Sequence, residues 1–512
     1  MNKETEIDMK EVELNELDPE KQPMTDDGPA AGGEKNGSVK LKVPEDEVTF
    51  TGLSKEELMK VAGTQGWVRT RWVLLILFWL GWVGMLAGAI VIIVQAPRCK
   101  PIPEMNWWNE GPLYQISDLD AFNDGIKGVK EKLDDLNQLK VKGLVLGPFH
   151  VLQEDQPVAL KLEEIDPEKG TKEDLVAMME KAHKKGISVV LDLTPNYLGS
   201  APWFSADHDD IVEKVRAAAE HWLNLGVDGI KISDFTVASN SQHWSKLLAA
   251  VQGNRTEEDT KRKALVGVVE GLAAAEVSQL VNTTGVDLLL SDVLSSKTDG
   301  VERIRAIDAL HSQQRSVGWS LGAAKHDHLS KLAATSGLIH LYQLLLFTMP
   351  GTPVFTYGDE IGLAAAQGTN STKMFWDVEK EPSKEDAVDE AAEAVRKERV
   401  ALRKWFKSLS DLRGKERSLL HGDYYPLHSS ASSLSFLRLW DQSDRYITAM
   451  NWGAAPETLT LKLTSEDGVK LPEEAKVRMS TDETLVVDST ISLDKVTVAP
   501  GQAVLLQFPY TG

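Results

Sequence analysis

The stretch IDPEKGTKEDLVAMMEKAHKKGISVVLDLTPNY, residues 165–197, decides the fold of this chain. Its first part is amphipathic, a pattern that is typical of a helix lying against a core. The apolar run ISVVLDL then begins at Ile187 and predicts a strand. A helix that leads into such a strand is the repeating unit of parallel α/β folds.

Seven more apolar runs of this kind have helical segments between them. They begin at Leu113, Lys142, Asp228, Ala264, Val286, Val317 and Pro353. Eight strands that alternate with helices predict a (β/α)8 barrel of the TIM type over residues 107–415. From about Ser418, short alternating strands follow without helical spacers. They predict a C-terminal antiparallel β-sandwich domain over residues 416–512.

An uncharged apolar run of 22 residues, 73–94, precedes the barrel. A helix that rises about 1.5 Å per residue covers the roughly 30 Å hydrocarbon core of a bilayer over this length. The run therefore predicts a single transmembrane helix over residues 72–95. A cleaved signal peptide is disfavoured, because the run is long and more than seventy residues precede it.

The basic residues that flank this run are more numerous on its N-terminal side. Those before it are Lys55, Lys60, Arg69 and Arg71, and those close after it are Arg98 and Lys100. This bias predicts type II topology, with the N-terminus in the cytoplasm and everything after Cys99 outside the cell.

Residues 1–60 contain sixteen Asp and Glu, eight Lys, no Arg and few aromatic residues. A segment of this composition does not bury enough apolar surface to fold. Residues 1–71 are therefore predicted to be a disordered acidic cytoplasmic tail and juxtamembrane segment. The formal net charge of the whole chain, −21, argues against nucleic-acid binding, which needs a basic face.

Three glycines in the apolar run predict contact with another helix. Gly81, Gly84 and Gly88 recur at spacings of three and four. This spacing places them along one helical face, where a second helix can approach closely. Ordinary glycine enrichment of membrane helices is the alternative explanation.

Cys99 is the only cysteine in the sequence and lies in a proline-bounded polar neck, residues 96–106. Because no second cysteine exists, an intramolecular bridge is excluded. On the extracellular side the thiol either pairs with another molecule or stays free. Palmitoylation is an alternative for a juxtamembrane cysteine, and a homodimer through Cys99 also stays open.

The barrel sequence resembles the α-amylase-type glycoside hydrolases of the oligo-glucosidase branch. The resemblance rests on residues 165–197, on GVDGIKIS at 226–233, on LLLFTMPGTPVFTYGDEIGL at 344–363 and on MFWD at 374–377. It implies a barrel with a nucleophilic Asp after strand four, an acid Glu after strand five and a third Asp after strand seven. Retaining enzymes of this type need two of these carboxyl groups about 5 Å apart.

The positions that carry catalysis in those hydrolases hold other residues here. Ser233 replaces the nucleophile, Lys231 replaces the Arg that precedes it, and Val268 replaces the acid. The nearest carboxylates, Asp234 and Glu270, are one and two residues out of register, and one step along a strand reverses the face of a side chain. We therefore expect no catalytic residue, no metal ligand and no cofactor site.

Other positions also depart from the hydrolase pattern. Trp319 lies in the run that replaces the strand-seven motif, and Tyr197 stands where a substrate-contacting His is expected. After Asn196, only about thirty residues lead to the fourth strand, too few for the subdomain that walls the substrate cleft. Asp192, Asn196 and Asp228 remain, and we interpret them as framework hydrogen-bonding residues.

The single-pass anchor, acidic tail, extracellular cysteine and emptied barrel together resemble the heavy subunits of heteromeric amino-acid transporters. The motifs FTGLSKEEL, GWVRTRW, FWLGW, KVKGLVLGP, LDLTPNY and KERSLLHGD strengthen this resemblance and favour the cell-surface antigen branch over the cystinuria-related branch. The resemblance implies that a polytopic light chain transports the amino acid. It also implies that Cys99 links the two chains, and that this subunit supports the stability of the light chain and its delivery to the plasma membrane.

Two other functions stay open at the level of sequence. One is a membrane-anchored α-glucosidase whose catalytic residues are Asp234 and Glu270 in an altered register. The other is an adhesion receptor that acts without a transporter; the family resemblance implies association with integrins, which the residues themselves do not support.

Three Asn-x-Ser/Thr sites on the predicted extracellular side are candidates for N-glycosylation, at Asn254, Asn282 and Asn370. Asn36 fits the same pattern but lies on the predicted cytoplasmic side. We expect it to carry no glycan.

Overall fold

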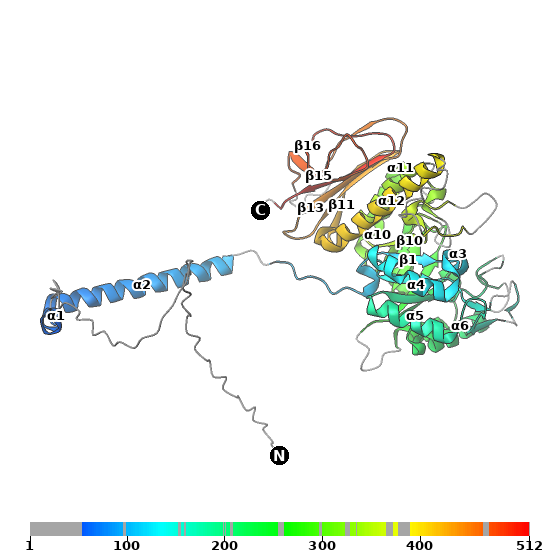
Figure 1. Cartoon of the computed structure of the whole chain (residues 1–512), viewed down its shortest axis with the longest axis horizontal. Helices are drawn as coiled ribbons and strands as arrows, with labels where there is room; N and C mark the ends of the chain where they lie inside the picture. The colour runs from blue at the N-terminus through cyan, green and yellow to red at the C-terminus, as the bar shows by residue number, and fades with distance from the viewer. Residues whose placement is uncertain are drawn as a thin grey trace, which may run out of the picture. The chain divides into compact units, whose positions relative to one another are not determined.

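The computed structural model describes residues 54–510, apart from 96–98, 152–154, 158–159, 198, 200, 205–207, 254–260, 296–298, 323–327, 334, 365–371, 377–389 and 464–469 (Figure 1). Contacts divide the chain into two compact units, Met1–Pro97 and Arg98–Gly512. Each unit is described by itself.

The N-terminal unit contains two helices, α1 (Lys55–Ala62) and α2 (Gln65–Gln95), drawn in blue in Figure 1. Ser54 caps α1 in a reciprocal capping box: its hydroxyl accepts the Glu57 N–H, and the Glu57 carboxylate accepts the Ser54 N–H. Helix α2 is 31 residues long, and its apolar window is not buried inside the protein. Within the described chain it is the one helix long and apolar enough to cross a membrane, as the sequence predicts.

The prediction of a disordered segment over residues 1–71 is wrong for its last part. Helix α1 and the first turns of α2 occupy most of residues 55–71, and α2 begins before the predicted span of 72–95. The capping box at Ser54 starts the first helix locally. A helix that crosses a membrane also continues beyond the hydrocarbon core, where charged side chains are tolerated. The predicted disorder of residues 1–53 lies outside the described residues.

Eight parallel strands close into a barrel, so the (β/α)8 prediction is confirmed. In chain order they are β1 (Leu113–Ile116), β2 (Gly143–Leu146), β5 (Ser188–Asp192), β6 (Gly229–Ile232), β7 (Ala264–Val269), β8 (Leu288–Ser291), β9 (Val317–Trp319) and β10 (Thr352–Thr356). Each of the eight apolar runs in the sequence supplies one of them. Strand β1 pairs with both β2 and β10 and thereby closes the ring.

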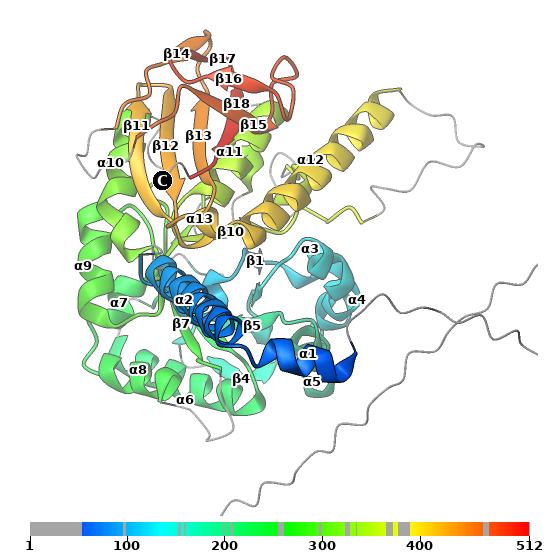
Figure 2. The same ribbon diagram turned by 90° about the vertical axis from the view of Figure 1, so that its left-hand side faces the viewer.

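The barrel helices lie around the strands in Figure 2. The longer ones are α4 (Gly125–Gln138), α5 (Lys172–Lys184), α6 (His208–Leu225), α8 (Trp244–Gln252), α9 (Ala274–Thr284), α10 (Gly300–Leu310) and α11 (Ser336–Thr348). The shorter elements are α3 (Leu119–Asn123), α7 (Phe235–Ser239), η1 (Trp107–Asn109), η3 (His311–Gln313), η4 (Leu329–Lys331), η5 (Asp359–Ile361), β3 (His150–Val151) and β4 (Lys161–Ile165). Helix α6 makes up half of the connection between β5 and β6.

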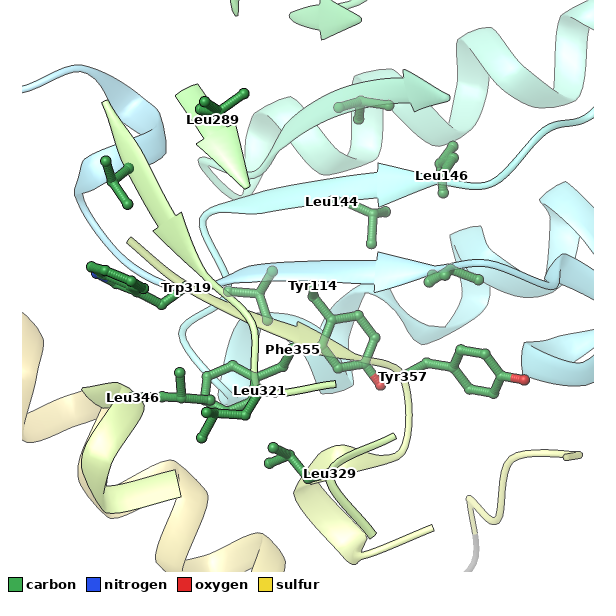
Figure 3. Packing of buried hydrophobic residues seen from close by; sticks show 14 of the residues in the cluster. Tyr114, Leu144, Leu146, Leu289, Trp319, Leu321, Leu329, Leu346, Phe355 and Tyr357 are labelled. Atoms are coloured by element: carbon green, nitrogen blue, oxygen red, sulfur yellow. The ribbon is translucent and has the colours of Figure 1, made fainter. Parts of the chain in front are cut away.

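The barrel strands separate two apolar clusters, because alternate side chains point to opposite faces of a strand. Leu113 belongs to the cluster inside the barrel. Its neighbour Tyr114 belongs to the outer core, with Leu144 from β2 and Leu346 from α11. Figure 3 shows this outer packing around Tyr114 and Phe355. Both faces of each strand are therefore buried, which explains why the sequence shows continuous apolar runs.

Two tryptophans of η1 close the N-terminal end of the barrel. The indole N–H of Trp107 donates to the Arg262 carbonyl over 2.9 Å, and that of Trp108 donates to the Arg315 carbonyl over 3.3 Å. These carbonyls lie just before β7 and β9. Gly143 leaves room for the Trp107 side chain, because a Cβ at this position would lie 2.8 Å from the Trp107 ring.

After the barrel, α12 (Glu390–Lys415) and α13 (Arg417–His421) lead into an antiparallel β domain. Its six-stranded sheet has the order β11 (Asp423–Ser429), β12 (Ser433–Leu439), β13 (Arg445–Asn451), β18 (Gln502–Phe508), β15 (Glu474–Ser480) and β16 (Thr490–Ser492). Strands β14 (Glu457–Leu459) and β17 (Val496–Val498) form a second, two-stranded sheet.

The six-stranded sheet buries both of its faces. Phe436 and Leu505 join the main core shared with the barrel helices. Their strand neighbours Leu437 and Leu506 point the other way and pack with Leu459 of the small sheet. The antiparallel β domain is confirmed, and the small sheet forms the second layer of the predicted sandwich.

Candidate functional site

The mouth of the barrel, at the C-terminal ends of its strands, is where enzymes of this fold carry their catalytic groups. Here a buried ion pair occupies it: Lys231 of β6 donates from Nζ to Asp192 Oδ2 of β5 over 2.9 Å. Burial alone would raise the pKa of Asp192, but the Lys231 ammonium and the Thr194 hydroxyl outweigh burial and hold this pKa below its ordinary value. Both charges are therefore satisfied by one another inside the fold.

Ser233, the residue at the nucleophile position, is buried directly after β6. Its N–H donates to Thr194 Oγ1, and its carbonyl accepts the Trp203 indole N–H over 2.9 Å. The Ser233 hydroxyl has no hydrogen-bond partner among the described residues. A serine hydroxyl needs an adjacent base to act as a nucleophile, and no base among the described residues is hydrogen-bonded to it.

The carboxylates that the glucosidase alternative requires lie outside the barrel core. Asp234 is exposed, adopts a left-handed backbone conformation with φ of 49°, and accepts the Thr236 hydroxyl. Glu270 is exposed immediately after β7. By contrast, Val268 at the acid position is buried in the apolar barrel interior. Trp319 is likewise buried, and its indole N–H donates to the Pro350 carbonyl.

The polar residues that this chain shares with the hydrolase pattern have hydrogen-bond partners within the chain. Asp228 lies just before β6, at the opposite end of the barrel from Asp192, and accepts the Val189 N–H at 2.8 Å. Its carboxylate also contacts His183 Nε2 at 2.7 Å and Lys261 Nζ at 3.2 Å. Burial would raise the pKa of Asp228, but these partners lower it below its ordinary value.

Asn196 and Tyr197 lie in the turn after β5. The Asn196 amide exchanges hydrogen bonds with the backbone and carboxylate of Asp155. The Tyr197 hydroxyl donates to the Ser117 carbonyl over 3.2 Å. These contacts support the predicted framework role of the turn.

His150 at the mouth was not among the residues predicted from the sequence. It follows the run KGLVLGPF by one residue, at the end of the second barrel strand and its loop. Burial lowers its pKa to about 4, although the nearby Asp192 charge acts in the opposite direction. An imidazole with this pKa is neutral at physiological pH.

The described residues contain no group of three or more His, Cys, Asp or Glu side chains that would hold a metal ion.

The glycine stripe lies on one face of α2, as its spacing predicts. A Cβ added at Gly81, Gly84 or Gly88 would meet no atom within 4 Å. The described chain therefore leaves this face open for close approach.

Cys99 is exposed in the neck, with a free thiol. The next residue, Lys100, is fastened to the β domain of the same unit. Its N–H donates to Asp441 Oδ2 over 3.0 Å, and its ammonium lies 3.5 Å from Asp423 and 4.7 Å from the centre of the Trp440 ring. The thiol thus stands beside an attachment point rather than in a freely moving linker.

The glycosylation candidates are only partly visible. Asn282 is exposed on α9, which makes its side chain accessible to modification. Asn254 and Asn370 lie outside the described residues.

A closed parallel barrel followed by an antiparallel β domain defines the α-amylase-like fold class. An α-amylase from Geobacillus thermoleovorans superposes with a TM-score of 0.58 at 18% identity, covering 79% of this chain and 99% of that chain. A debranching enzyme from Nostoc punctiforme gives a TM-score of 0.58 at 16% identity, covering 80% of this chain and 100% of that chain. At these identities the likeness concerns the fold alone. The family described as "Alpha amylase, catalytic domain" matches residues 114–210.

Similarity of the N-terminal segment and of the full sequence to known proteins defines the family within this fold class. The family described as "Solute carrier family 3 member 2 N-terminus" matches residues 38–114. "Amino acid transporter heavy chain SLC3A2" of Mus musculus is 43% identical over 528 residues, and the match covers all of both chains. The "Amino acid transporter heavy chain SLC3A1" of Rattus norvegicus is 22% identical over 623 residues, with 92% of this chain and 89% of that protein covered. This chain belongs to the family of amino acid transporter heavy chains.

Proposed function

We propose that this chain is the heavy subunit of a heterodimeric amino-acid transporter. It binds a polytopic light chain, forms a disulfide with it through Cys99, and supports its stability and its delivery to the plasma membrane. The observation that carries this proposal is the 43% identity, over the full length of both chains, to a protein named as an amino acid transporter heavy chain. The light chain transports the amino acid, because a single helix does not enclose a midplane substrate site.

The proposed topology is type II, with the N-terminus in the cytoplasm. Support comes from one apolar helix in the described chain and from the excess of basic residues before it, including Arg69 and Arg71. In this orientation Cys99 and the barrel are extracellular, where a thiol is stable in a disulfide. Asn254, Asn282 and Asn370 are then accessible to glycosylation, whereas Asn36 is not.

The transmembrane helix and the neck contribute to binding of the light chain in different ways. The stripe of Gly81, Gly84 and Gly88 packs against a helix of the light chain through close backbone approach. The Cys99 disulfide then acts as a tether, which raises the effective concentration of one chain at the other and makes separation rarer. The disulfide is therefore not required to supply most of the affinity.

We further propose that the barrel has no glycosidase activity. A retaining glycosidase needs an acid and a nucleophile about 5 Å apart across the scissile bond. The nucleophile position holds Ser233, the acid position holds Val268, and the exposed Asp234 and Glu270 are out of register. The buried Lys231–Asp192 pair contributes to folding rather than to chemistry.

The test of the heavy-subunit role is purification of the full chain from its own membranes in mild detergent, followed by a non-reducing gel. We expect one heavier band that separates into two different chains on reduction. A chain that migrates alone, or a band that reduces to this chain only, contradicts the heavy-subunit role and favours a receptor or a homodimer.

The enzymatic alternative has its own test, incubation of the same preparation with an aryl α-glucoside. We expect no turnover above that of a preparation without the protein. Turnover that disappears in both Asp234→Ala and Glu270→Ala would establish the α-glucosidase instead. Glu131→Ala, which removes an exposed carboxylate on α4, controls for a general effect of losing one negative charge.

A further inference from the structure

A cavity of about 430 Å³ lies within the C-terminal unit, between the neck, the barrel and the β domain. The neck supplies Lys100 and the apolar residues after it. The loop before β9 supplies Arg315, and the end of α12 supplies Arg413. The motif KERSLLHGD, residues 415–423, contributes His421 and Asp423.

Positive charge collects around this cavity although the chain as a whole carries a net charge of −21. Lys100, Arg315 and Arg413 line it, and Asp423 is the carboxylate in the lining. That carboxylate is already paired, because Lys100 Nζ lies 3.5 Å from it. The pKa of His421 is lowered by burial and then by four nearby guanidinium groups, which shows how closely the cations gather. These groups belong to Arg315, Arg417, Arg413 and Arg438.

Two of these arginines are buried without a carboxylate partner in the described chain. Arg413 is 2% exposed, and its guanidinium donates to the carbonyls of Phe347, Met349 and Gly351. Burial lowers its pKa to about 10, so it stays charged at physiological pH.

Arg438 is 0% exposed and donates to the carbonyls of Thr348 and Gly422. The Nε atoms of Arg413 and Arg438 have no hydrogen-bond partner among the described residues. Buried charges are ordinarily paired with an opposite charge, because desolvation is costly. Arg413 lines the cavity and is held only by neutral carbonyls, so it favours an anion there. Arg438 does not line the cavity and only adds to the positive charge near it.

We propose that this cavity binds a phosphate group, either as free inorganic phosphate or as the headgroup of a lipid. Guanidinium groups match the geometry of phosphate oxygens and bind them by charge-assisted hydrogen bonds, while a lysine adds a point charge. Arg315 is exposed at the rim and is free to close over the ligand, and Arg413 supplies charge from the buried side. Apolar lining residues such as Ile102 and Leu420 suit the carbon part of a phosphoester.

The test uses the full chain in an uncharged detergent, with thermal unfolding and calorimetric titration as the two readouts. Sodium phosphate is compared with sodium chloride at equal ionic strength, and dihexanoyl phosphatidic acid with dihexanoylglycerol, which has the same acyl chains and no phosphate. A ligand that binds only the folded state raises the unfolding temperature in a saturable way. We expect such a rise with phosphate and none with chloride.

Arg315→Ala is the informative variant, because its side chain is exposed and its backbone carbonyl still accepts from Trp108 and Asn109. Loss of one charge-assisted hydrogen bond predicts an affinity that is weaker by about ten-fold or more. Arg305→Ala, which removes an exposed arginine of α10 outside the cavity lining, should bind like the parent chain.

Tighter binding of the phosphatidic acid than of phosphate assigns the site to lipid, and equal binding assigns it to free phosphate. Absence of saturable binding for both probes would overturn the proposal. Equal weakening by Arg315→Ala and Arg305→Ala would overturn it too, because it would place binding elsewhere. Capture of the light chain is a separate measurement, so failure here leaves the heavy-subunit role untouched.

Discussion

The mouth of the barrel and the membrane anchor differ in whether their side chains have partners within the chain. At the mouth, Lys231 and Asp192 are buried and bonded to each other, and Val268 fills the acid position with apolar volume. On α2 no residue is buried, and an atom added at Gly84 would meet nothing. A surface already paired within its own chain has little left to offer a ligand, whereas an exposed apolar surface needs a covering partner or lipid. Under the proposed function, this difference assigns recognition to the anchor and leaves the barrel as a scaffold.

The largest expected effect is that of Cys99→Ser. Because this is the only cysteine in the sequence, the heavier band on a non-reducing gel should disappear completely. Co-purification of the light chain and surface delivery should persist at a detectable level, if the proposed helix packing holds the two chains together without the bridge. Complete loss of the complex would show that the disulfide, and not the helix, holds the chains together.

A second prediction concerns the mouth. Lys231→Met leaves the buried Asp192 carboxylate without its partner, which should lower the free energy of unfolding by about 3–5 kcal/mol. Denaturant unfolding measures this change. The double variant Lys231→Met with Asp192→Asn should regain part of the loss, because no charge is then left buried. Folded Lys231→Met protein should still capture the light chain. A defect in capture would show that the mouth of the barrel takes part in binding the light chain.

Glu360 gives a pH-dependent prediction on the same side of the barrel, after β10. It is buried, accepts the Tyr114 hydroxyl over 3.0 Å, and burial raises its pKa from 4.5 to about 7. The folded state thus retains a proton that the unfolded state releases between these values. The contribution of Glu360 to stability is fully present below pH 4.5 and falls as the pH rises to 7, by about 1.4 kcal/mol for each pH unit.

Glu360→Gln removes this titration. The variant should be more stable than the parent chain at pH 8, by about 3 kcal/mol, and the difference should vanish near pH 4.5. Urea unfolding at both pH values measures it, with the exposed Glu131→Gln as the matched control. An unchanged difference across this range would contradict the raised pKa.

The smallest expected effect is that of Gly84→Leu on α2. A large side chain in the stripe keeps the partner helix away, which should cost about 1–2 kcal/mol of association and lower co-purification roughly ten-fold. Ala89→Leu makes a similar small-to-large change about a quarter turn or more away from the stripe. It should leave co-purification near the parent level, and equal losses in both variants would count against the stripe.

Much of the fold was predictable from the sequence because its strands are buried on both faces. The run ALVGVV became β7, and every residue of that strand, Ala264–Val269, is buried. The residues at the hydrolase catalytic positions were also readable, since Ser233 directly follows β6 and Val268 lies in β7, and family motifs define the register of both strands. In both cases the signal is local.

The features that were not predicted from the sequence have two physical causes. Helix α1 carried a local signal, the Ser54–Glu57 capping box, which the acidic composition of the segment hid. The attachment of Lys100 to Asp441 joins residues 341 positions apart. Such contacts form only once the barrel and the β domain are folded, so no periodicity in the sequence reveals them. The cationic cavity is of the same kind, because its lining comes from segments far apart in the chain.

Under the proposed function, the anchor and neck, rather than the barrel, capture the light chain. The direct measurement replaces residues 65–95 with an unrelated single-pass helix in the Cys99→Ser background and quantifies the light chain that co-purifies in mild detergent. We expect capture to fall to the background level, whereas Lys231→Met with an intact anchor should retain it. Capture that persists after the replacement would instead assign binding to the extracellular unit.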